Sequence, residues 1–242
     1  MQFSTAVSPH LKPQSSVTKV MFQVLLALVP GAATMYWFFG VGVLINITLA
    51  IATAVISEAV VLWLRKRPVA VHLMDLSAVV TAVLLGLALP VLAPWWVTVI
   101  GTMFAIIIAK HLYGGLGYNP FNPAMAGYVL LLVSFPKPMT AWLAPSGIGT
   151  VALSSADMFK IIFLEQLPAK MNIDAITMAT PLDSLKTQLG LNKAIDEVMG
   201  QPVFGLVSGK GWEWVSLAYL IGGLWLIQRR VIAWQIPLGM LT

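Results

Sequence analysis

The polar stretch 174–180, with the sequence Asp-Ala-Ile-Thr-Met-Ala-Thr, holds the residues of this chain best suited to chemistry. Its last residue, Thr180, precedes Pro181, and Asp183 follows two positions later, which is a typical pattern for the start of a helix. Backbone N–H groups at a helix start lack partners and favour a phosphate group. Thr180 is therefore either a plain helix cap on a surface loop or a hydroxyl that carries a phosphate-linked cofactor.

The composition is that of an integral membrane protein. Of 242 residues, 59% are hydrophobic and only 10% are charged, whereas soluble domains carry about 25% charged residues. The sequence has no cysteine, which excludes disulfides, thiolate metal sites and catalytic thiols on this chain. Redox chemistry would therefore need a bound organic cofactor or a partner subunit. The net charge of +5 is explained by basic residues at cytoplasmic helix ends, so we expect no nucleic-acid partner.

Apolar runs predict the membrane spans, because a spanning helix needs about 20 mostly apolar residues. Such runs occupy 18–39, 41–64, 74–94, 95–112 and 212–228, another begins at 231, and a shorter one covers 123–135. We expect an all-α polytopic membrane protein, a helical bundle with about six complete transmembrane helices plus a truncated seventh. The remaining helices of the second half are expected to be missing from this sequence.

The basic residues predict the orientation. If every run crosses the membrane, eight of them lie on one side, which the positive-inside tendency makes cytoplasmic; they are Lys12, Lys19, Arg65, Lys66, Arg67, Lys110, Arg229 and Arg230. The chain then divides into an N-terminal membrane domain (1–135), an outer loop (136–211) and the start of a second membrane half (212–242). The outer loop should contain short helices near 154–167, 181–191 and 193–199, because capping residues and apolar periodicity recur there.

Ionisable residues near the spans are a second group of candidates. Glu58 is a candidate for an ion path, whereas Asp75 and Glu213 stand at span starts, where the helix dipole favours an acid. His72 and His111 do not share a helix face, so structural roles at the interface are expected for them. The Gly/Asn/Pro-rich string 114–123, here called the broken stretch, interrupts the apolar runs. Four of its residues allow either close helix packing or a lining for a second flavin or an ion passage; they are Gly114, Gly115, Asn119 and Asn122.

The broken stretch belongs to a longer segment, 108–125, with the sequence IAKHLYGGLGYNPFNPAM. This segment closely resembles the signature of the RnfD (RsxD) subunits of Rnf electron-transport complexes, whose sister family is NqrB of the sodium-pumping NADH:quinone reductase. Other segments of this chain also resemble the family and occur in the same order as in its members. They lie at 8–10, 174–180, 212–214, 222–225 and 234–237. The resemblance covers nearly the whole chain and implies a ten-helix bundle with two related halves.

The resemblance also implies a cofactor. In this family a flavin transferase recognises Asp-x-x-Ser/Thr-x-Ala-Thr and joins FMN through its phosphate, as a phosphodiester, to the final threonine. Here Thr180 is the implied acceptor, while Asp174, Thr177 and Ala179 are motif positions, and Met178 stands where a small residue is usual. A second, non-covalent flavin (riboflavin) is a further expectation.

The implied function is that of a subunit that passes electrons between ferredoxin- and NAD-linked partners, coupled to Na⁺ or H⁺ translocation. The implied location is the bacterial inner membrane, with a cytoplasmic N-terminus and a periplasmic Thr180 loop. Implied partners are RnfA, RnfB, RnfC, RnfE, RnfG, the flavin transferase and the lipid bilayer. Two alternatives stay open: a non-redox transporter or channel with a discontinuous helix, and a scaffold subunit without a cofactor.

Overall fold

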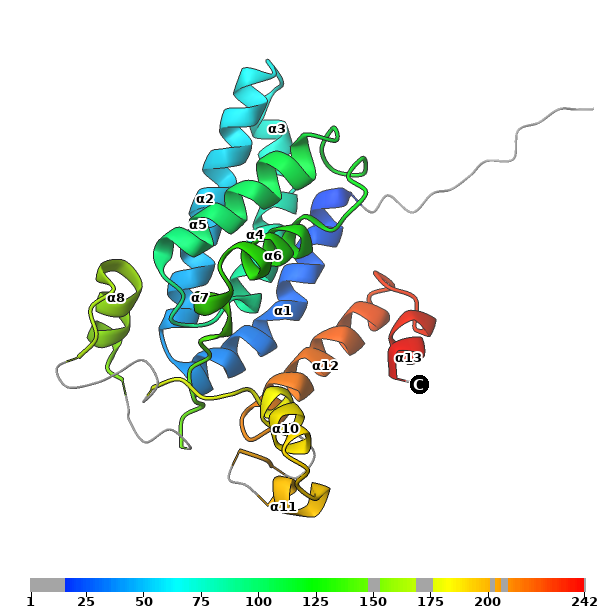
Figure 1. Cartoon of the computed structure of the whole chain (residues 1–242). Helices are drawn as coiled ribbons and strands as arrows, with labels where there is room; N and C mark the ends of the chain where they lie inside the picture. The colour runs from blue at the N-terminus through cyan, green and yellow to red at the C-terminus, as the bar shows by residue number, and fades with distance from the viewer. Residues whose placement is uncertain (1–15, 148–152, 169–175, 201–202, 206–208, 242) are drawn as a thin grey trace, which may run out of the picture.

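The computed structural model describes residues 16–147, 153–168, 176–200, 203–205 and 209–241 (Figure 1). Across these residues the regular elements are helices, and β-pairing is limited to two isolated bridges. The all-α prediction is therefore confirmed for the described part of the chain. In chain order the elements are α1 (Val17–Phe39), α2 (Gly42–Leu64), α3 (Val69–Leu73), α4 (Ser77–Ala88), α5 (Trp95–Met103), η1 (Phe104–His111), α6 (Pro123–Ser134), α7 (Pro136–Thr140), α8 (Ser155–Leu164), α10 (Pro181–Gly190), α11 (Ile195–Met199), α12 (Trp212–Gln228) and α13 (Gln235–Leu241).

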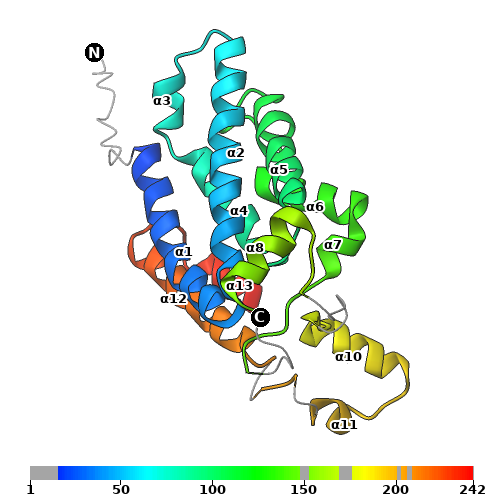
Figure 2. The same ribbon diagram turned by 90° about the vertical axis from the view of Figure 1, so that its left-hand side faces the viewer.

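The apolar helices form one bundle, in which α2 packs against α4, α5 and η1, and α6 covers α5 and η1. Helix α12 packs along α1 although nearly 200 residues separate them in sequence (Figures 1 and 2). The largest buried cluster joins the end of α1 to the outer loop and to α12, through Phe39, Leu143, Ile176 and Val215. This cluster fixes the position of the segment that leads to Thr180.

Only some of the predicted spans form a single helix that is long enough to cross a membrane. Helices α1 and α2, of 23 residues each, are long and apolar enough to cross a membrane. The prediction of one helix over 74–94 is wrong in extent, because only Ser77–Ala88 is helical. Leu76 has a left-handed backbone (φ 62°) and Leu89 is extended just before Pro90, so both ends of α4 are broken. Twelve residues of helix span about 18 Å, and the exact number of crossings stays a prediction.

The predicted fourth span is a continuous helix that changes from α5 to the π-helical η1 at Phe104. Stretches of π-helix are rare and occur often at functional sites. Lys110, expected at the cytoplasmic end of the fourth span, is 2% exposed. His111, expected at the membrane interface, is also buried. Burial is possible because both side chains find a carboxylate partner inside the bundle, as described below.

The outer loop contains the three predicted short helices, as α8, α10 and α11. Helix α8 begins with a capping box, in which the Asp157 N–H donates to Ser154 Oγ and the Ser154 N–H donates to the Asp157 carboxylate. The Ser154 hydroxyl also donates to this carboxylate, and these hydrogen bonds hold the pKa of Asp157 below its ordinary value. Helix α11 ends at Met199, the predicted last residue, and Gly200 is its C-cap.

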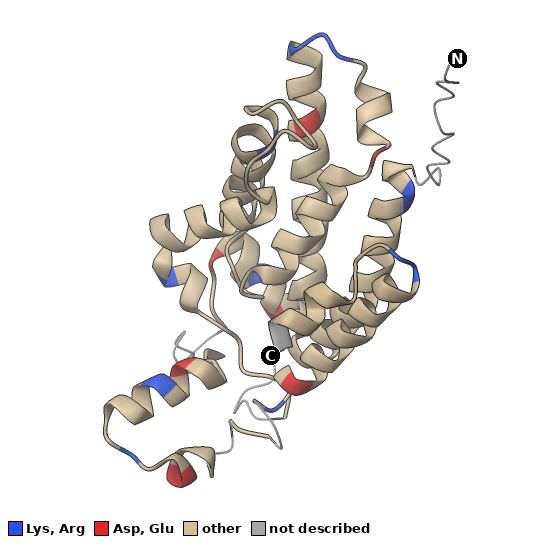
Figure 3. Cartoon of the chain, turned by 90° about the vertical axis from the view of Figure 1, so that its right-hand side faces the viewer, with Lys and Arg blue, Asp and Glu red and all other residues tan. Residues whose placement is uncertain are grey.

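The chain connections collect at two ends of the bundle. The turn 65–67, the start of α1 and the loop 112–122 lie at one end, whereas α8, α10 and α11 lie toward the other (Figures 1 and 2). Figure 3, a ribbon coloured by charge, shows Lys and Arg positions at the first end, with acidic positions nearby, and a mixture of both charges along the outer loop. This distribution agrees with a shared side for the basic turns, and the membrane orientation itself stays a prediction.

Candidate functional site

A short antiparallel pairing holds the segment before Thr180. The Met178 N–H donates to Trp142 O (2.9 Å), and a β-bridge joins Thr177 to Leu143. Ile176, 4% exposed, anchors this pairing in the core. Thr177 is half-buried and Ala179 is exposed, whereas Asp174 lies outside the described residues. The structure thus brings three of the four predicted motif positions together on one extended segment.

Thr180 is the N-cap of α10, as the sequence predicted. Its backbone is extended (φ −60°, ψ 155°), and its Oγ1 accepts a hydrogen bond from the Asp183 N–H (3.3 Å). Pro181 is the first helical residue and needs no N–H partner. The cap hydrogen bond holds the hydroxyl at the helix start. Because the residue is only half-buried, the hydroxyl also remains accessible to a reagent.

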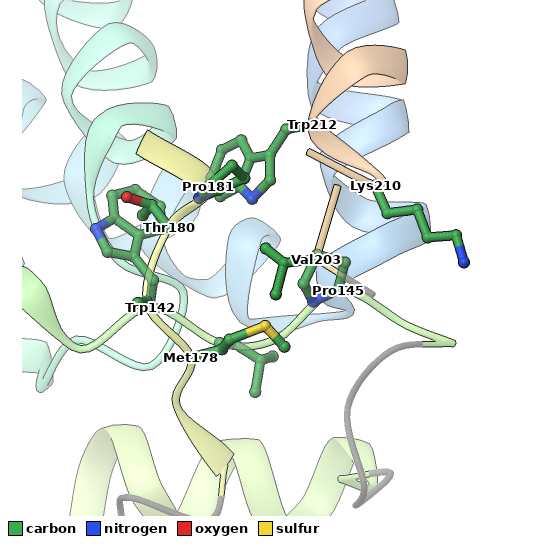
Figure 4. A pocket seen from close by; sticks show the side chains of 10 residues that line it. Trp142, Pro145, Met178, Thr180, Pro181, Val203, Lys210 and Trp212 are labelled. Carbon is green, nitrogen blue, oxygen red and sulfur yellow. The ribbon is translucent and has the colours of Figure 1, made fainter. Parts of the chain in front are cut away.

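Thr180 is one of the residues that line an open pocket with a volume of about 10 Å³, enough for about one water molecule (Figure 4). The lining is mostly apolar, and two half-buried tryptophans contribute to it; the full set is Trp142, Leu143, Pro145, Met178, Ala179, Thr180, Pro181, Val203, Lys210 and Trp212. Gly209 faces Pro181 so closely that a Cβ on Gly209 would collide with the proline ring. The chain before α12 therefore packs directly on the start of α10.

The pocket fits a flavin in its chemistry. A helix start is suited to a phosphate, Thr180 supplies a hydroxyl for an ester, and the aromatic lining is suited to a planar ring. Phe39, Trp212 and Trp142 form a row of rings, with centroids 4.9 Å apart for the first pair and 5.4 Å for the second. Phe39 is fully buried, so this row connects the pocket to the hydrophobic cluster at the end of α1. The sequence predicted the threonine but not this row of rings.

A cluster of buried charges lies within the bundle. Glu58 Oε1 accepts hydrogen bonds from Lys110 Nζ (2.6 Å) and pairs with His111 Nε2 (3.1 Å). Lys110 Nζ also donates to Ser77 Oγ (2.7 Å), and Asp75 accepts from the Ser77 N–H at the start of α4. Glu58 Oε2 is buried without a hydrogen-bond partner among the described residues. Sequence reasoning identified Glu58 as a candidate but missed Lys110, because 52 residues separate the two.

A second, larger pocket, with a volume of about 270 Å³, adjoins this cluster. The broken stretch lines it together with α1 and α4; the lining is Met21, Ser77, Val80, Thr81, Leu84, Lys110, Leu116, Asn119, Asn122 and Pro123. Gly114, Gly115 and Gly117 all have positive φ, a conformation that favours glycine. Positive φ explains these glycines, since a Cβ at Gly117 would meet nothing within 4 Å and one at Gly115 only His111 at 4.0 Å; at Gly114 a Cβ would also crowd Tyr118, at 3.2 Å.

The fold and the Thr180 site define a class: an all-α membrane protein with a threonine-bearing outer loop. The chain belongs to the NQR2, RnfD, RnfE family, whose profile matches residues 4–242. It is 49% identical over 250 residues to a protein of Escherichia fergusonii whose name describes the D subunit of an ion-translocating oxidoreductase complex. Proteins with the same name are similar in Shewanella piezotolerans (50% over 247 residues) and Vibrio cholerae (51% over 251 residues). All of this chain is covered, and it spans 71%, 71% and 72% of these relatives.

Proposed function

We propose that this protein is the membrane subunit of an Rnf-type complex and carries FMN covalently on Thr180. Family membership and the names of the relatives support the complex. The observation that carries the cofactor assignment is the accessible Thr180 hydroxyl at a helix start, beside an aromatic pocket. When bound, the isoalloxazine ring would accept and donate electrons between ferredoxin- and NAD-linked partners, in a process coupled to Na⁺ or H⁺ movement.

The attachment needs only a hydroxyl from this chain. A flavin transferase would bring a flavin nucleotide whose phosphate is activated as a diphosphate. The Thr180 oxygen forms a bond to the flavin-bearing phosphorus, the diphosphate bond breaks, and a nucleoside monophosphate leaves with the hydroxyl proton. The dipole at the start of α10 favours the phosphodiester charge after transfer, although Pro181 has no N–H and the Asp183 N–H already donates to Thr180 Oγ1. Thr177 and Ala179, on the paired segment, would present the recognition motif to the transferase.

Mass spectrometry of the peptide spanning 171–186, in protein co-expressed with the transferase, tests this assignment. We expect FMN mass on Thr180 and none after Thr180→Val, while the folded membrane domain persists. Thr177→Val is the matched control, because it removes a recognition hydroxyl and not the acceptor, so it should keep part of the label. FMN on Thr177 and not Thr180, or on neither, would contradict the assignment. Absence of a fluorescent flavin band on a denaturing gel would favour the non-redox transporter.

The proposed location is the bacterial inner membrane, with the N-terminus in the cytoplasm and the Thr180 loop in the periplasm. Single cysteines in this cysteine-free chain test the orientation. Lys66 and Lys186 are both exposed. The turn after α2, which contains Lys66, and helix α10, which contains Lys186, lie toward opposite ends of the molecule (Figure 1). An impermeant thiol reagent applied to intact cells should label Cys at position 186 and not at 66, and the reverse pattern would overturn the orientation.

The larger pocket is the proposed place for a second, non-covalent flavin. Lys110, Ser77, Asn119 and Asn122 give it hydrogen-bonding groups, and its apolar lining suits a ring. Riboflavin should be released from purified protein on denaturation, and Asn122→Leu should lower the released amount without changing the covalent label on Thr180. Equal riboflavin release from both proteins would argue against this position.

A further inference from the structure

We propose that the side chains of Trp142 and Trp212 form an aromatic wall that holds the isoalloxazine ring of the flavin carried by Thr180. This inference rests on the proposed function, since it concerns the ring of that flavin. It names the residues that would fix the ring, which the acceptor motif does not specify. The motif positions the phosphate, and nothing in residues 176–180 provides an aromatic surface.

The position of the two rings is the first argument. Trp142 and Trp212 line the same pocket as Thr180, although one stands in the extended segment after α7 and the other begins α12 (Figure 4). Their centroids are 5.4 Å apart in an edge-to-face arrangement. Both side chains are half-buried, so each ring keeps a surface that a ligand can contact.

The rigidity of the wall is the second argument. Trp212 packs on Phe39, which is 1% exposed and belongs to the core at the end of α1. Trp142 is fixed by its carbonyl, which accepts the Met178 N–H two residues before Thr180. The wall and the acceptor are thus parts of one packed unit, and a ring on the wall would keep a fixed distance from the membrane core.

The indole N–H groups are the third argument. Trp96 Nε1 donates to Glu165 (2.8 Å) and Trp225 Nε1 donates to Gln23 (2.9 Å). By contrast, the Nε1 groups of Trp142 and Trp212 have no hydrogen-bond partner in the part of the chain that the structure describes. Neither nitrogen is among the buried polar atoms that lack a partner in this part of the chain, so both are open to solvent and to a ligand. These two groups can donate to the carbonyl or phosphate oxygens of a flavin.

The test uses this chain, produced in membranes with the flavin transferase and purified in detergent. The variants are Trp142→Leu, Trp212→Leu and the conservative Trp212→Phe, with Trp214→Phe as the control. Trp214 is 58% exposed and does not line the pocket, although it stands only two residues from Trp212. Three quantities are measured: flavin on a denaturing gel, native flavin fluorescence per bound flavin, and the anisotropy of that fluorescence.

We expect an equal covalent label in all variants, because Thr180 and the motif are unchanged. Indole rings quench flavin emission and restrain the ring, so each Leu variant should raise native fluorescence and lower its anisotropy. Loss of one ring–ring contact should raise the population of detached rings roughly two- to tenfold. Trp212→Phe should restore anisotropy, and Trp214→Phe should match the parent protein.

Two other outcomes would contradict the aromatic wall. A labelled parent protein whose fluorescence and anisotropy stay unchanged in both Leu variants would overturn the wall while leaving the Thr180 assignment intact. A parent protein without covalent label would overturn the proposed function, and the wall with it. Trp142 lies outside the transmembrane helices, so Trp142→Leu gives the answer even if Trp212→Leu disturbs the packing of α12.

Discussion

Two helix starts of this protein share a local pattern, a capping side chain followed by proline, but they lie in different chemical surroundings. Thr180 caps α10 and Asn122 caps α6, each directly before a proline. Both residues line a pocket, but the Thr180 pocket is walled by tryptophans and the Asn122 pocket adjoins the buried ion pair of Glu58 and Lys110. The same capping chemistry therefore serves an aromatic site on the outer loop and a charged site inside the bundle.

The difference predicts how each region responds to mutation. Buried charges contribute to stability through their partners, so a lost partner leaves a costly uncompensated charge. The aromatic site lies on a loop that packs on the bundle, so changes there should alter labelling and flavin environment more than folding.

The largest expected effect is at the charged site. Lys110→Met should destabilise the protein by about 3–5 kcal/mol, because Glu58 would keep a buried charge without its ammonium partner. Lys160→Met, on the exposed face of α8, is the matched control and should melt like the parent protein. Thermal unfolding in detergent measures both. Adding Glu58→Gln to Lys110→Met should recover most of the loss, and no recovery would show that the pair is not the cause.

The next effect is at the aromatic site. Gly209→Ala should push Pro181 away and destabilise the start of α10 by about 1–3 kcal/mol, as overpacking usually does. We expect weaker FMN labelling of Thr180, measured on a denaturing gel at equal protein amounts. Gly190→Ala, at the end of the same helix, has open space around its new Cβ and should label normally. Equal labelling of both variants would contradict the role of this contact.

A smaller effect is expected at the inner helix start. Asn122→Ala removes the side-chain oxygen that accepts the Ala124 N–H (3.0 Å) and should cost about 1 kcal/mol. Met125→Ala changes an exposed residue of the same helix and should leave the melting temperature nearly unchanged. If the two variants melt alike, the cap at Asn122 contributes nothing measurable, and the parallel with Thr180 is only geometric.

The smallest effect is a dependence on pH at α8. The folded pKa of Asp157 lies below its ordinary value of 3.8, because Ser154 hydrogen-bonds to the ionised carboxylate. The resulting stability is present above the unfolded pKa and is lost as pH falls through the folded pKa. Asp157→Asn should therefore melt slightly below the parent protein at neutral pH, and the gap should close in acid. A gap that stays constant with pH would exclude this carboxylate as its source.

The sequence determined the local features of the protein. The Thr-Pro and Ser-x-x-Asp patterns predicted the starts of α10 and α8, because a cap needs only residues within one turn. The apolar runs predicted the bundle helices, and the Gly/Asn/Pro string identified the family. Extents were predicted less well: the left-handed backbone at Leu76 has no strong local signal, whereas Pro90 is a local signal for the end of α4 at Leu89 that the apolar run concealed.

Contacts between distant segments were decided only by the tertiary structure. The Glu58–Lys110 pair joins residues 52 positions apart, and packing in the bundle buries Lys110, which the sequence placed only at the cytoplasmic end of a span. The aromatic row likewise requires three segments to pack together: α1, α12 and the segment that follows α7. No local sequence pattern specifies this contact. Capping follows from the bonding needs of one helical turn, whereas ion pairs and ring contacts depend on which helix faces pack together.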